Sequence, residues 1–452
     1  MARDDVQVCG LWPWAVGAGS PAIGVPLGRN HNDLLSAVAF DPLSWFTRAR
    51  LILNPSVFIL GLPALGKSSL TRRLVIGTAG MGAVPLILGD LKPDYVALVR
   101  TLGGQVIPLG RGHGSLNVLD VGAMDQAAAV VGGTEGARMR EEAHARRLNI
   151  VRALLTLARG SGLADYEVVT LSAALRVLAR RWRRRKAAPL LGDLVALLEE
   201  GPEEVRAVTL ARGDDARYRS TVDALHRSLL ALLDGPLGAV FARPTTERLR
   251  LDAPAVCIDV SGISASDTAL QAAALLACWS EGFGAVEAAN ALADAGKGPQ
   301  RRFLAILDEL WRVLRAGEGL VNQVDELTRL NRNQGVGQVM ITHSVADLRA
   351  LRAEEDREKA RGFIERSGAL ICGGLPAQEL RDLAGIVSFS RAEQELITSW
   401  STPPGWGAAE DPPGLGNFVI KVGQRPGVPF HVELTEAELA GFNNTNRRWA
   451  AS

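Results

Sequence analysis

The chain has little cysteine: its 452 residues include only four, at Cys9, Cys257, Cys278 and Cys372. These residues stand far apart and none has C-x-x-C spacing, so the sequence argues against both a zinc site and a disulfide framework. We therefore predict that the thiols are reduced and that the protein works in the cytoplasm.

The chain also lacks a strong net charge, a signal peptide and long apolar runs. Its formal net charge is +1, and 47% of its residues are apolar, which is typical of a soluble globular protein. Without a strongly positive overall field, any DNA contact must come from a local patch. The first residues, MARDDVQVCG, contain no apolar core, and no apolar run reaches the roughly 18 residues of a membrane span. If the protein works at a membrane, a partner must hold it there.

Lysine is scarce as well, since only six of the fifty basic residues are lysines. One of them lies in FILGLPALGKSSLTRRLV, residues 58–75, where Gly61, Gly66, Lys67 and Ser68 satisfy the pattern G-x-x-x-x-G-K-[ST]. An apolar strand pattern precedes this loop and an amphipathic segment follows it, which is the context that a phosphate-binding loop requires.

Such a loop predicts a nucleotide site. Backbone N–H groups from about Gly66 to Ser69, at a helix N-terminus, would surround the phosphates. Lys67 would neutralise the β- and γ-phosphates of ATP, and the Ser68 hydroxyl would be one ligand of Mg²⁺. Pro63 departs from the usual loop composition because it has no N–H to donate. The alternative is a helix-capping glycine turn that binds nothing.

The alternation of strand and helix patterns predicts an α/β fold with a mostly parallel central sheet. Residues 1–50 are a strand-rich N-terminal segment, and residues 51–125 and 241–400 are the two halves of the α/β core. Residues 126–240 are rich in Ala, Leu, Arg and Glu at helical spacing, which predicts an all-helical insertion. Residues 401–452 begin with a Pro/Gly-rich loop and contain two strand-like runs, which predict a closing hairpin.

Two carboxylates follow the apolar run in RRFLAILDELWRVL, residues 301–314. Asp308 and Glu309 stand where a strand ends, at the edge where α/β sheets bind ligands. Asp308 would hold the Mg²⁺ shell, and Glu309 would accept the proton of the attacking water. We expect this pair to face the loop around Lys67 across adjacent strand ends. The alternative is an ordinary strand end with a solvated acidic helix start.

Another strand pattern, in RNQGVGQVMITHS, residues 332–344, ends in a polar cluster of Thr342, His343 and Ser344. A polar side chain here would sense the γ-phosphate or orient water, and a helix N-cap by Thr342 or Ser344 is a compatible alternative. Arg332 precedes this strand, and an arginine presented to a neighbouring subunit's nucleotide can contribute on the order of 10³ to 10⁵ in rate. Because arginine is so common in this chain, position alone argues weakly for that role.

Taken in order, these segments resemble the ATPase domain of the VirB-type, TraC-like conjugation ATPases, which are type IV secretion motors in the HerA/FtsK branch of P-loop enzymes. The motifs that carry the resemblance are GVPLG, FILGLPALGKSS, GDLKPDY, GGQVIPLGRGHGSLNVLD, AVCIDVSG, FLAILDELW, RNQGVGQVMITHSVADL, ALICGG and GNFVIKVGQRPGVPFHVELTEAEL. The resemblance runs from about residue 22 to the end. It implies a RecA-like P-loop NTPase fold with an all-helical subdomain near residues 126–235.

The resemblance also implies roles by position. Lys67 and Ser68 match the phosphate-loop pair, and Asp308 and Glu309 match the acidic pair, which is followed by an aromatic residue at Trp311. ATP and Mg²⁺ are the implied cofactors.

Other positions match the family less well. Arg332 matches the first residue of a basic pair, which supports a role in trans, but Asn333 replaces the usual lysine. His343 stands where the family usually has glutamine, and its charge varies near neutral pH, which weakens the sensor role. Asp90 and Asp94 match an acidic pair near the magnesium or the subunit interface.

The implied partners are other copies of the chain, in a hexamer, together with inner-membrane secretion components and a coupling ATPase. The protein is then cytoplasmic, or peripheral at the cytoplasmic face of the inner membrane. Family members usually carry a large N-terminal docking domain, whereas this chain begins almost at the ATPase domain. We expect either a separate docking polypeptide or a reduced system.

The densest basic run is RRWRRRK, residues 180–186, which is better explained as the solvated face of a helix end than as a DNA contact. Our first hypothesis is therefore a hexameric ATPase motor that powers assembly or the transfer of DNA or protein in a conjugation-type secretion system. The alternatives are a HerA-like DNA translocase and a nucleotide-dependent assembly scaffold that hydrolyses ATP poorly. The sequence does not identify the transported substrate.

Overall fold

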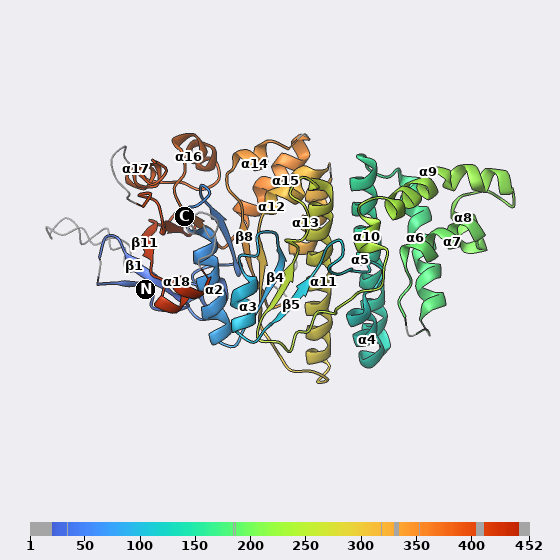
Figure 1. The fold of residues 1–452 in the computed structure, drawn as a ribbon, viewed down its shortest axis with the longest axis horizontal. Coiled ribbons are helices and arrows are strands. Elements are labelled where there is room, and N and C mark those ends of the chain that lie inside the picture. The colour runs from blue at the N-terminus through green and yellow to red at the C-terminus, as the bar shows by residue number, and fades with distance from the viewer. Residues whose placement is uncertain are drawn as a thin grey trace. The chain divides into compact units, whose positions relative to one another are not determined.

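The computed structural model describes residues 20–442, apart from 34, 184, 186, 318, 330–333, 352 and 404–410. The chain divides into two compact units (Figure 1). The first unit comprises Met1–Pro85, Arg302–Trp311 and Asn331–Ser452, and the second comprises Leu86–Arg301 and Arg312–Leu330.

The first unit is built on strands in the order β2-β1-β11-β10-β9-β3-β8-β7. The pairs β3–β8, β3–β9 and β7–β8 are parallel, whereas β1, β2, β10 and β11 make antiparallel pairs. Every residue of β3, β7, β8 and β9 is buried, as expected of parallel strands covered on both faces. The strand bounds are β1 Pro26–Asn30, β2 Ala37–Ala39, β3 Ser56–Leu60, β7 Phe303–Leu307, β8 Val336–Ile341, β9 Ala369–Cys372, β10 Asn417–Lys421 and β11 Val428–Val432.

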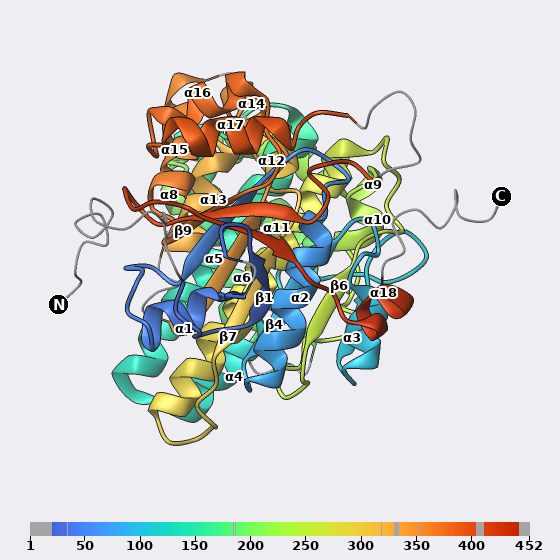
Figure 2. The same cartoon turned by 90° about the vertical axis from the view of Figure 1, so that its left-hand side faces the viewer.

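The helices of this unit connect the strands and cover the sheet. Figure 2 shows α14, α15, α16 and α17 gathered together at one end of the unit. The bounds are α1 Pro42–Thr47, α2 Lys67–Gly80, α14 Ala346–Arg349, α15 Glu354–Glu365, α16 Ala377–Ala384, α17 Arg391–Ser399 and α18 Glu436–Phe442. Two further elements, β4 (Val84–Asp90) and α12 (Leu310–Ala316), cross the boundary between the units.

The second unit has a parallel set of strands in the order β4-β6-β5, and most of its remaining residues are helical. From Gly122 to Phe241, its described residues form helices and no strand, which agrees with the expected all-helical insertion. The domain boundaries that we drew from the sequence remain a prediction. The bounds are α3 Val96–Thr101, β5 Gln105–Pro108, α4 Gly122–Val131, α5 Gly133–Arg159, α6 Asp165–Trp182, α7 Leu191–Glu200, α8 Glu203–Val208, α9 Asp215–Asp234, α10 Gly238–Phe241, β6 Val256–Asp259, α11 Thr268–Asp294 and α13 Leu320–Arg329.

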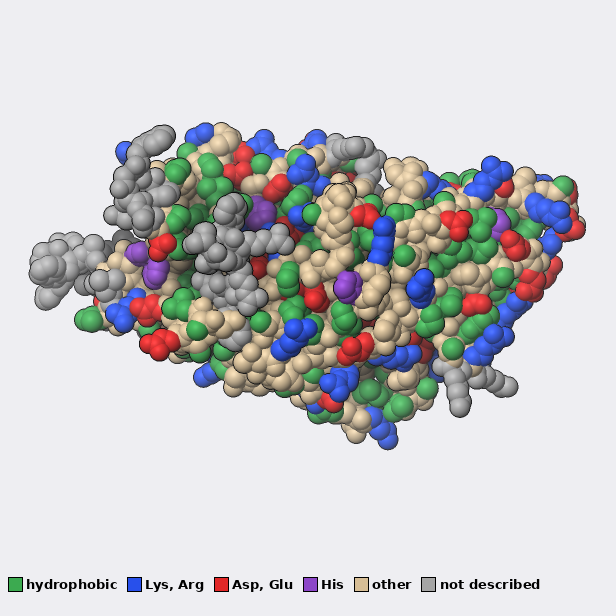
Figure 3. Space-filling model, in the orientation of Figure 1, with side chains coloured by type: hydrophobic (Ala, Val, Ile, Leu, Met, Phe, Trp, Pro, Cys, Tyr) green, Lys and Arg blue, Asp and Glu red, His purple; other side chains and the backbone are tan. Residues whose placement is uncertain are grey.

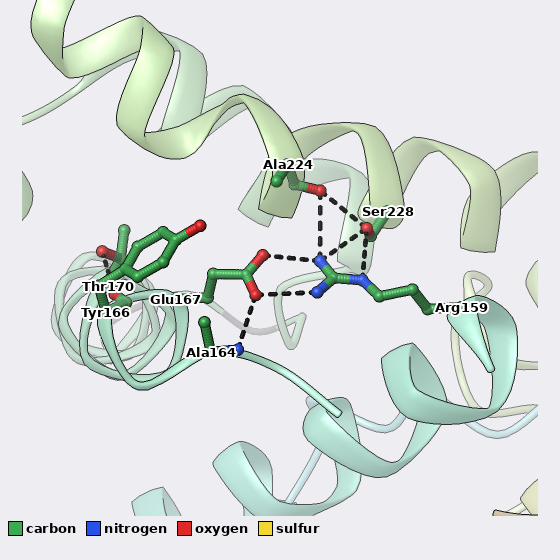
Figure 4. Close-up of polar contacts among 7 residues, drawn as sticks. All are labelled: Arg159, Ala164, Tyr166, Glu167, Thr170, Ala224 and Ser228. Carbon is green, nitrogen blue, oxygen red and sulfur yellow. Dashed lines mark hydrogen bonds and ion pairs between the residues drawn. The ribbon is translucent and has the colours of Figure 1, made fainter. Parts of the chain in front are cut away.

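A buried ion pair joins three helices of the insertion (Figure 4). Arg159, at the end of α5, donates from its two terminal nitrogens to both oxygens of Glu167 on α6, at 2.8 and 2.7 Å. Its Nε and Nη2 also donate to Ser228 Oγ on α9, at 3.0 and 2.8 Å. The Arg159 hydrogen bond is the largest influence on Glu167, and it holds the pKa of that carboxyl below its usual value. The pair therefore pins the α5–α6 turn to α9.

Helix α11 is the core helix of the second unit. Among the described residues it alone is long and apolar enough to cross a membrane, but 83% of its apolar window is buried within the protein. α4 and α5 pack along it. The described cysteines, Cys257, Cys278 and Cys372, are free and buried, and burial raises the pKa of each thiol, as expected of reduced core residues.

Candidate functional site

The predicted phosphate loop connects the buried strand β3 to α2 in the first unit. Gly66 caps the helix with φ of +96°, a left-handed conformation that glycine adopts readily. Lys67 is only 7% exposed, and its Nζ donates to the carbonyl oxygens of Gly61 at 2.5 Å and Leu62 at 2.9 Å. The loop thus curves around the lysine ammonium group, and backbone N–H groups at the start of α2 form the positive end of the helix dipole.

The loop is supported by backbone from two other segments. Leu62 N donates to Gly374 O at 3.0 Å, just after β9, and Gly416 N donates to Leu65 O at 3.1 Å, just before β10. A Cβ atom placed on Gly66 would lie 3.3 Å from Gly416 N, closer than most real contacts of that kind. These contacts support the shape of the loop.

The two predicted motifs lie at one edge of the sheet, but their strands are not neighbours. β8 lies between β3 and β7, which corrects our expectation of adjacent strand ends. All three strands are parallel, so the loop after β3, Thr342 after β8 and Asp308 after β7 share the carboxyl edge. With strands about 4.8 Å apart, the ends of β3 and β7 are separated by about 10 Å, enough for a phosphate and a metal ion.

Glu309 lies directly beyond β7 in an unusual conformation. Its φ is +54°, which is rare for glutamate, and its side chain is nearly buried. Trp311 Nε1 donates to Glu309 Oε2 at 2.5 Å, and His343 Nε2 lies 3.4 Å from the same oxygen. Glu309 N donates to Asp308 Oδ1 at 2.8 Å. The Glu309 carboxylate is therefore held by two side-chain neighbours on one oxygen.

The polar cluster after β8 contains two buried atoms without a hydrogen-bond partner among the described residues, Thr342 Oγ1 and His343 Nδ1. Unpartnered buried polar atoms are rare and call for an explanation, such as a ligand or a water molecule. Ser344 instead exchanges hydrogen bonds with Asp347, at 2.9 and 3.2 Å, as a residue at a helix start does. The helix-capping alternative thus applies to Ser344. Thr342 and His343 instead place buried polar atoms at the sheet edge that have no hydrogen-bond partner among the described residues.

The donor set suits magnesium nucleotide. Mg²⁺ in such sites takes one or two protein oxygens and completes its shell with phosphate oxygens and water, and Ser68 and Asp308 offer a hydroxyl and a carboxylate. In the described ranges, no group of three or more His, Cys, Asp or Glu residues is arranged to hold a metal ion by itself.

Arg332 and Asn333 fall outside the described residues. Asp90 lies in the second unit, where its carboxylate accepts from the backbone N–H of Asp94 at 3.0 Å and of Tyr95 at 2.8 Å. This bonding gives Asp90 a local role at the start of α3.

Two arginines of the basic run form ion pairs, and a third stacks on a tryptophan. Arg180 bonds to Glu204, and Arg181 bonds to Glu200 at 2.6 Å. Arg185 lies 4.0 Å over the Trp182 ring, a cation–π contact. On the face drawn in Figure 3, basic and acidic side chains are interspersed and no broad patch has one sign. These contacts favour the solvated-face explanation of the run.

Sequence reasoning missed other residues around the loop. Glu379 on α16 accepts from Val345 N at 2.6 Å and so orients the backbone after His343. Burial raises the pKa of the Glu379 carboxyl. Asn417 and His431, next to Gly416, were also missed. No local pattern marks these residues, because each reaches the site through tertiary contacts.

Comparison with solved structures supports this fold. The solved structure of VirB4 of Thermoanaerobacter pseudethanolicus matches with a TM-score of 0.68 and 18% identity, covering 94% of this chain and 100% of the solved VirB4 chain. The plasmid coupling protein TrwB, in complex with the non-hydrolysable GTP analogue GDPNP, matches with a TM-score of 0.50 and 15% identity over 93% of this chain and 97% of the solved TrwB chain. No protein-family model matches the chain, and no curated protein sequence matches it significantly.

The chain therefore has the RecA-like α/β fold of VirB4, with a mostly parallel central sheet and added helical segments. The resemblance noted from the sequence is confirmed at the level of the fold.

Proposed function

We propose that the chain is a P-loop ATPase that binds MgATP at the carboxyl edge of β3, β8 and β7 and hydrolyses it. One observation carries this proposal: parallel pairing of these three strands brings the phosphate loop, Thr342–His343 and Asp308–Glu309 to one edge of a sheet. This arrangement combines anion-binding backbone with carboxylates suited to a metal ion and to a base.

Each residue has a distinct task. Backbone N–H groups at Gly66, Ser68 and Ser69 bind phosphate oxygens. The Lys67 ammonium group, which donates to the carbonyl oxygens of Gly61 and Leu62, donates to the β- and γ-phosphates instead when nucleotide binds. Ser68 and Asp308 hold Mg²⁺, which when bound neutralises charge on the phosphates.

At the other end of the site, Glu309 accepts the proton of the attacking water. His343 donates a hydrogen bond near the γ-phosphate and also contacts Glu309. Arg332 reaches the nucleotide of a neighbouring subunit, which requires a ring-shaped oligomer.

We infer further that the chain belongs to the VirB-type conjugation ATPases. The fold shared with the whole of the solved VirB4 chain supports this inference, together with the sequence motifs. On this inference it is a hexameric cytoplasmic motor that powers assembly or the transfer of DNA or protein. Its partners are a coupling ATPase and inner-membrane secretion components, which hold it at the cytoplasmic face of the membrane.

The test is phosphate release from MgATP by the purified protein. We expect Glu309→Gln to abolish turnover while it still binds ATP, and Lys67→Ala to lose binding as well. Lys359→Ala is a matched control, because Lys359 is a helix-surface lysine paired with Glu355. Turnover that survives Glu309→Gln unchanged contradicts the assigned base.

A second function, a scaffold that binds nucleotide and hydrolyses it poorly, is favoured by one observation. The Glu309 carboxylate accepts from Trp311 on Oε2, and this bond stabilises the ionised carboxylate against taking up a proton. Wild-type protein that binds ATP but releases no phosphate under hexamer-forming conditions supports the scaffold over the motor.

A further inference from the structure

The strand order indicates where the nucleoside part of a bound nucleotide lies. This inference rests on the proposed function, in which the terminal phosphate points toward Asp308 and His343 on β7 and β8. Because β8 and β7 lie on one side of β3, the ribose and base must extend to the other side. There β9, β10 and β11 follow in the sheet.

The phosphate loop touches a polar cluster on that side. Gly416 N is bonded to Leu65 O at 3.1 Å, so this backbone flanks the loop. A Cβ atom placed on Gly416 would lie 3.0 Å from His431 Cε1, so the imidazole covers the flanking glycine. Asn417 follows Gly416 and lies opposite His431 in the β10–β11 register. The cluster thus begins one residue beyond the loop contact.

Asn417 binds two imidazoles through one oxygen. Its Nδ2 donates to Pro413 O at 2.7 Å, which identifies Oδ1 as the acceptor. His31 Nε2 and His431 Nδ1 lie 3.0 and 2.8 Å from that oxygen. Since an amide oxygen only accepts, both imidazoles donate to it, and their remaining nitrogens are acceptors when the rings are neutral.

The two imidazole rings are placed to meet a planar ligand. The His31 ring lies 5.5 Å from the Trp400 ring, tilted by 35°, and Trp400 is only 5% exposed. Trp400 therefore supports one face of His31, while His31 and His431 themselves are exposed. Partial desolvation, with a smaller effect of the His31 charge, lowers the pKa of His431, which favours the neutral ring.

We propose that His31, Asn417 and His431 form the base-binding end of the nucleotide site and favour adenine over guanine. An exposed imidazole face stacks on a purine, as aromatic side chains do on any base. The free ring nitrogen of the histidine that does not stack accepts from the amino group of adenine, whereas guanine presents the acceptor O6 at the corresponding position. No sequence motif marks these residues because His31 and Asn417 are 386 positions apart.

The experiment compares MgADP with magnesium tripolyphosphate, which has the phosphates but no base. We expect His431→Ala, alone or combined with His31→Ala in a double variant, to raise the Kd for MgADP by about 5- to 100-fold. Binding of magnesium tripolyphosphate should not change. Wild type should bind MgADP more tightly than MgGDP, and the double variant should lose this preference. His226→Ala is the control, because His226 lies on α9 and pairs with Glu199.

The outcomes separate the two proposals. If the variants bind MgADP as tightly as wild type does, the base site is wrong and the phosphate site stands. The same conclusion follows if the variants lose affinity for tripolyphosphate as strongly as they lose affinity for MgADP. If wild type binds neither probe, the proposed function fails and the base site with it.

A second measurement does not depend on the variants. The chain has six histidines, so ¹⁵N-histidine spectra are simple. MgADP should shift the signals of His31 and His431 and leave those of His113 and His226 in place. No shift at His31 and His431 in a protein saturated with MgADP overturns the proposal.

Discussion

Trp311 is expected to restrain the catalytic base that we assign. Its indole N–H donates to Glu309 Oε2 at 2.5 Å, and this bond opposes proton uptake by the carboxylate because it stabilises the ionised form. Trp311→Phe keeps the aromatic ring and removes the donor. We predict that the variant hydrolyses ATP faster than wild type in the absence of partners.

The size of the effect follows from the bond. A hydrogen bond to a charged group contributes about 1.5–3 kcal/mol, and each 1.36 kcal/mol changes a rate by a factor of about ten. His343 Nε2 remains 3.4 Å from the same oxygen and keeps part of the restraint. We therefore expect kcat to rise by about tenfold with KM unchanged, because the nucleotide contacts are not altered.

The assay is steady-state phosphate release over a range of MgATP concentrations. Trp279→Phe is a matched control, since the Trp279 indole N–H is buried without a hydrogen-bond partner among the described residues. Adding Glu309→Gln to Trp311→Phe should remove the gain. A kcat that falls or stays the same in Trp311→Phe, with Trp279→Phe normal, refutes the restraint.

Three further predictions concern stability. Burial raises the pKa of Glu281 to about 7, and the nearby charge of Asp120 adds a smaller effect. The folded state therefore holds this proton more tightly than the unfolded state does. The contribution of Glu281 to stability falls as the pH rises from about 4.5 to about 7. Glu281→Gln should then be more stable than wild type in urea at pH 8 and nearly equal to it at pH 4, below both pKa values; equal midpoints at both pH values contradict the shift. Glu167→Gln leaves the Arg159 guanidinium without its carboxylate in a nearly buried site, and it should lower the free energy of unfolding in urea by about 2–4 kcal/mol. The double variant Arg159→Met, Glu167→Leu should recover most of this stability. A Glu167→Gln variant as stable as wild type would show that the ion pair contributes little. Ala64 has φ of +65°, so Ala64→Gly should raise the free energy of unfolding by about 0.5–1 kcal/mol and raise the melting temperature with it. Ala79→Gly, within α2, should lower the melting temperature. If both variants change the melting temperature in the same direction, Ala64 is not strained by its left-handed conformation.

The parts of the fold that were predictable from sequence are local in the chain. The apolar run 56–60, the glycine spacing up to Gly66 and the helix after Lys67 are contiguous, so their patterns identify strand, loop and helix together. The run 303–307 before Asp308 was recognisable for the same reason. The helical spacing within residues 126–240 was equally local, and on α6 it places Leu171, Leu175 and Leu178 on a buried face.

The order of strands was not predictable in this way. Hydrophobic periodicity identifies a strand but not its neighbours, and so β8 between β3 and β7 was missed. The direction of the Glu309 side chain depends on a positive φ that glutamate rarely adopts. The contact of Asn417 with His31 depends on the antiparallel addition of β10, β11 and β1 beyond β9.

The most direct test of the central claim is calorimetric titration of MgATP and of metal-free ATP into wild type, Lys67→Ala and Asp308→Asn. We predict that wild type binds MgATP at one site per chain and more tightly than metal-free ATP. Lys67→Ala should bind neither MgATP nor metal-free ATP. Asp308→Asn should still bind ATP, but it should bind MgATP no more tightly than metal-free ATP. Equal heats in wild type and Lys67→Ala, or a magnesium advantage that survives Asp308→Asn, would contradict a shared nucleotide site at the ends of β3 and β7.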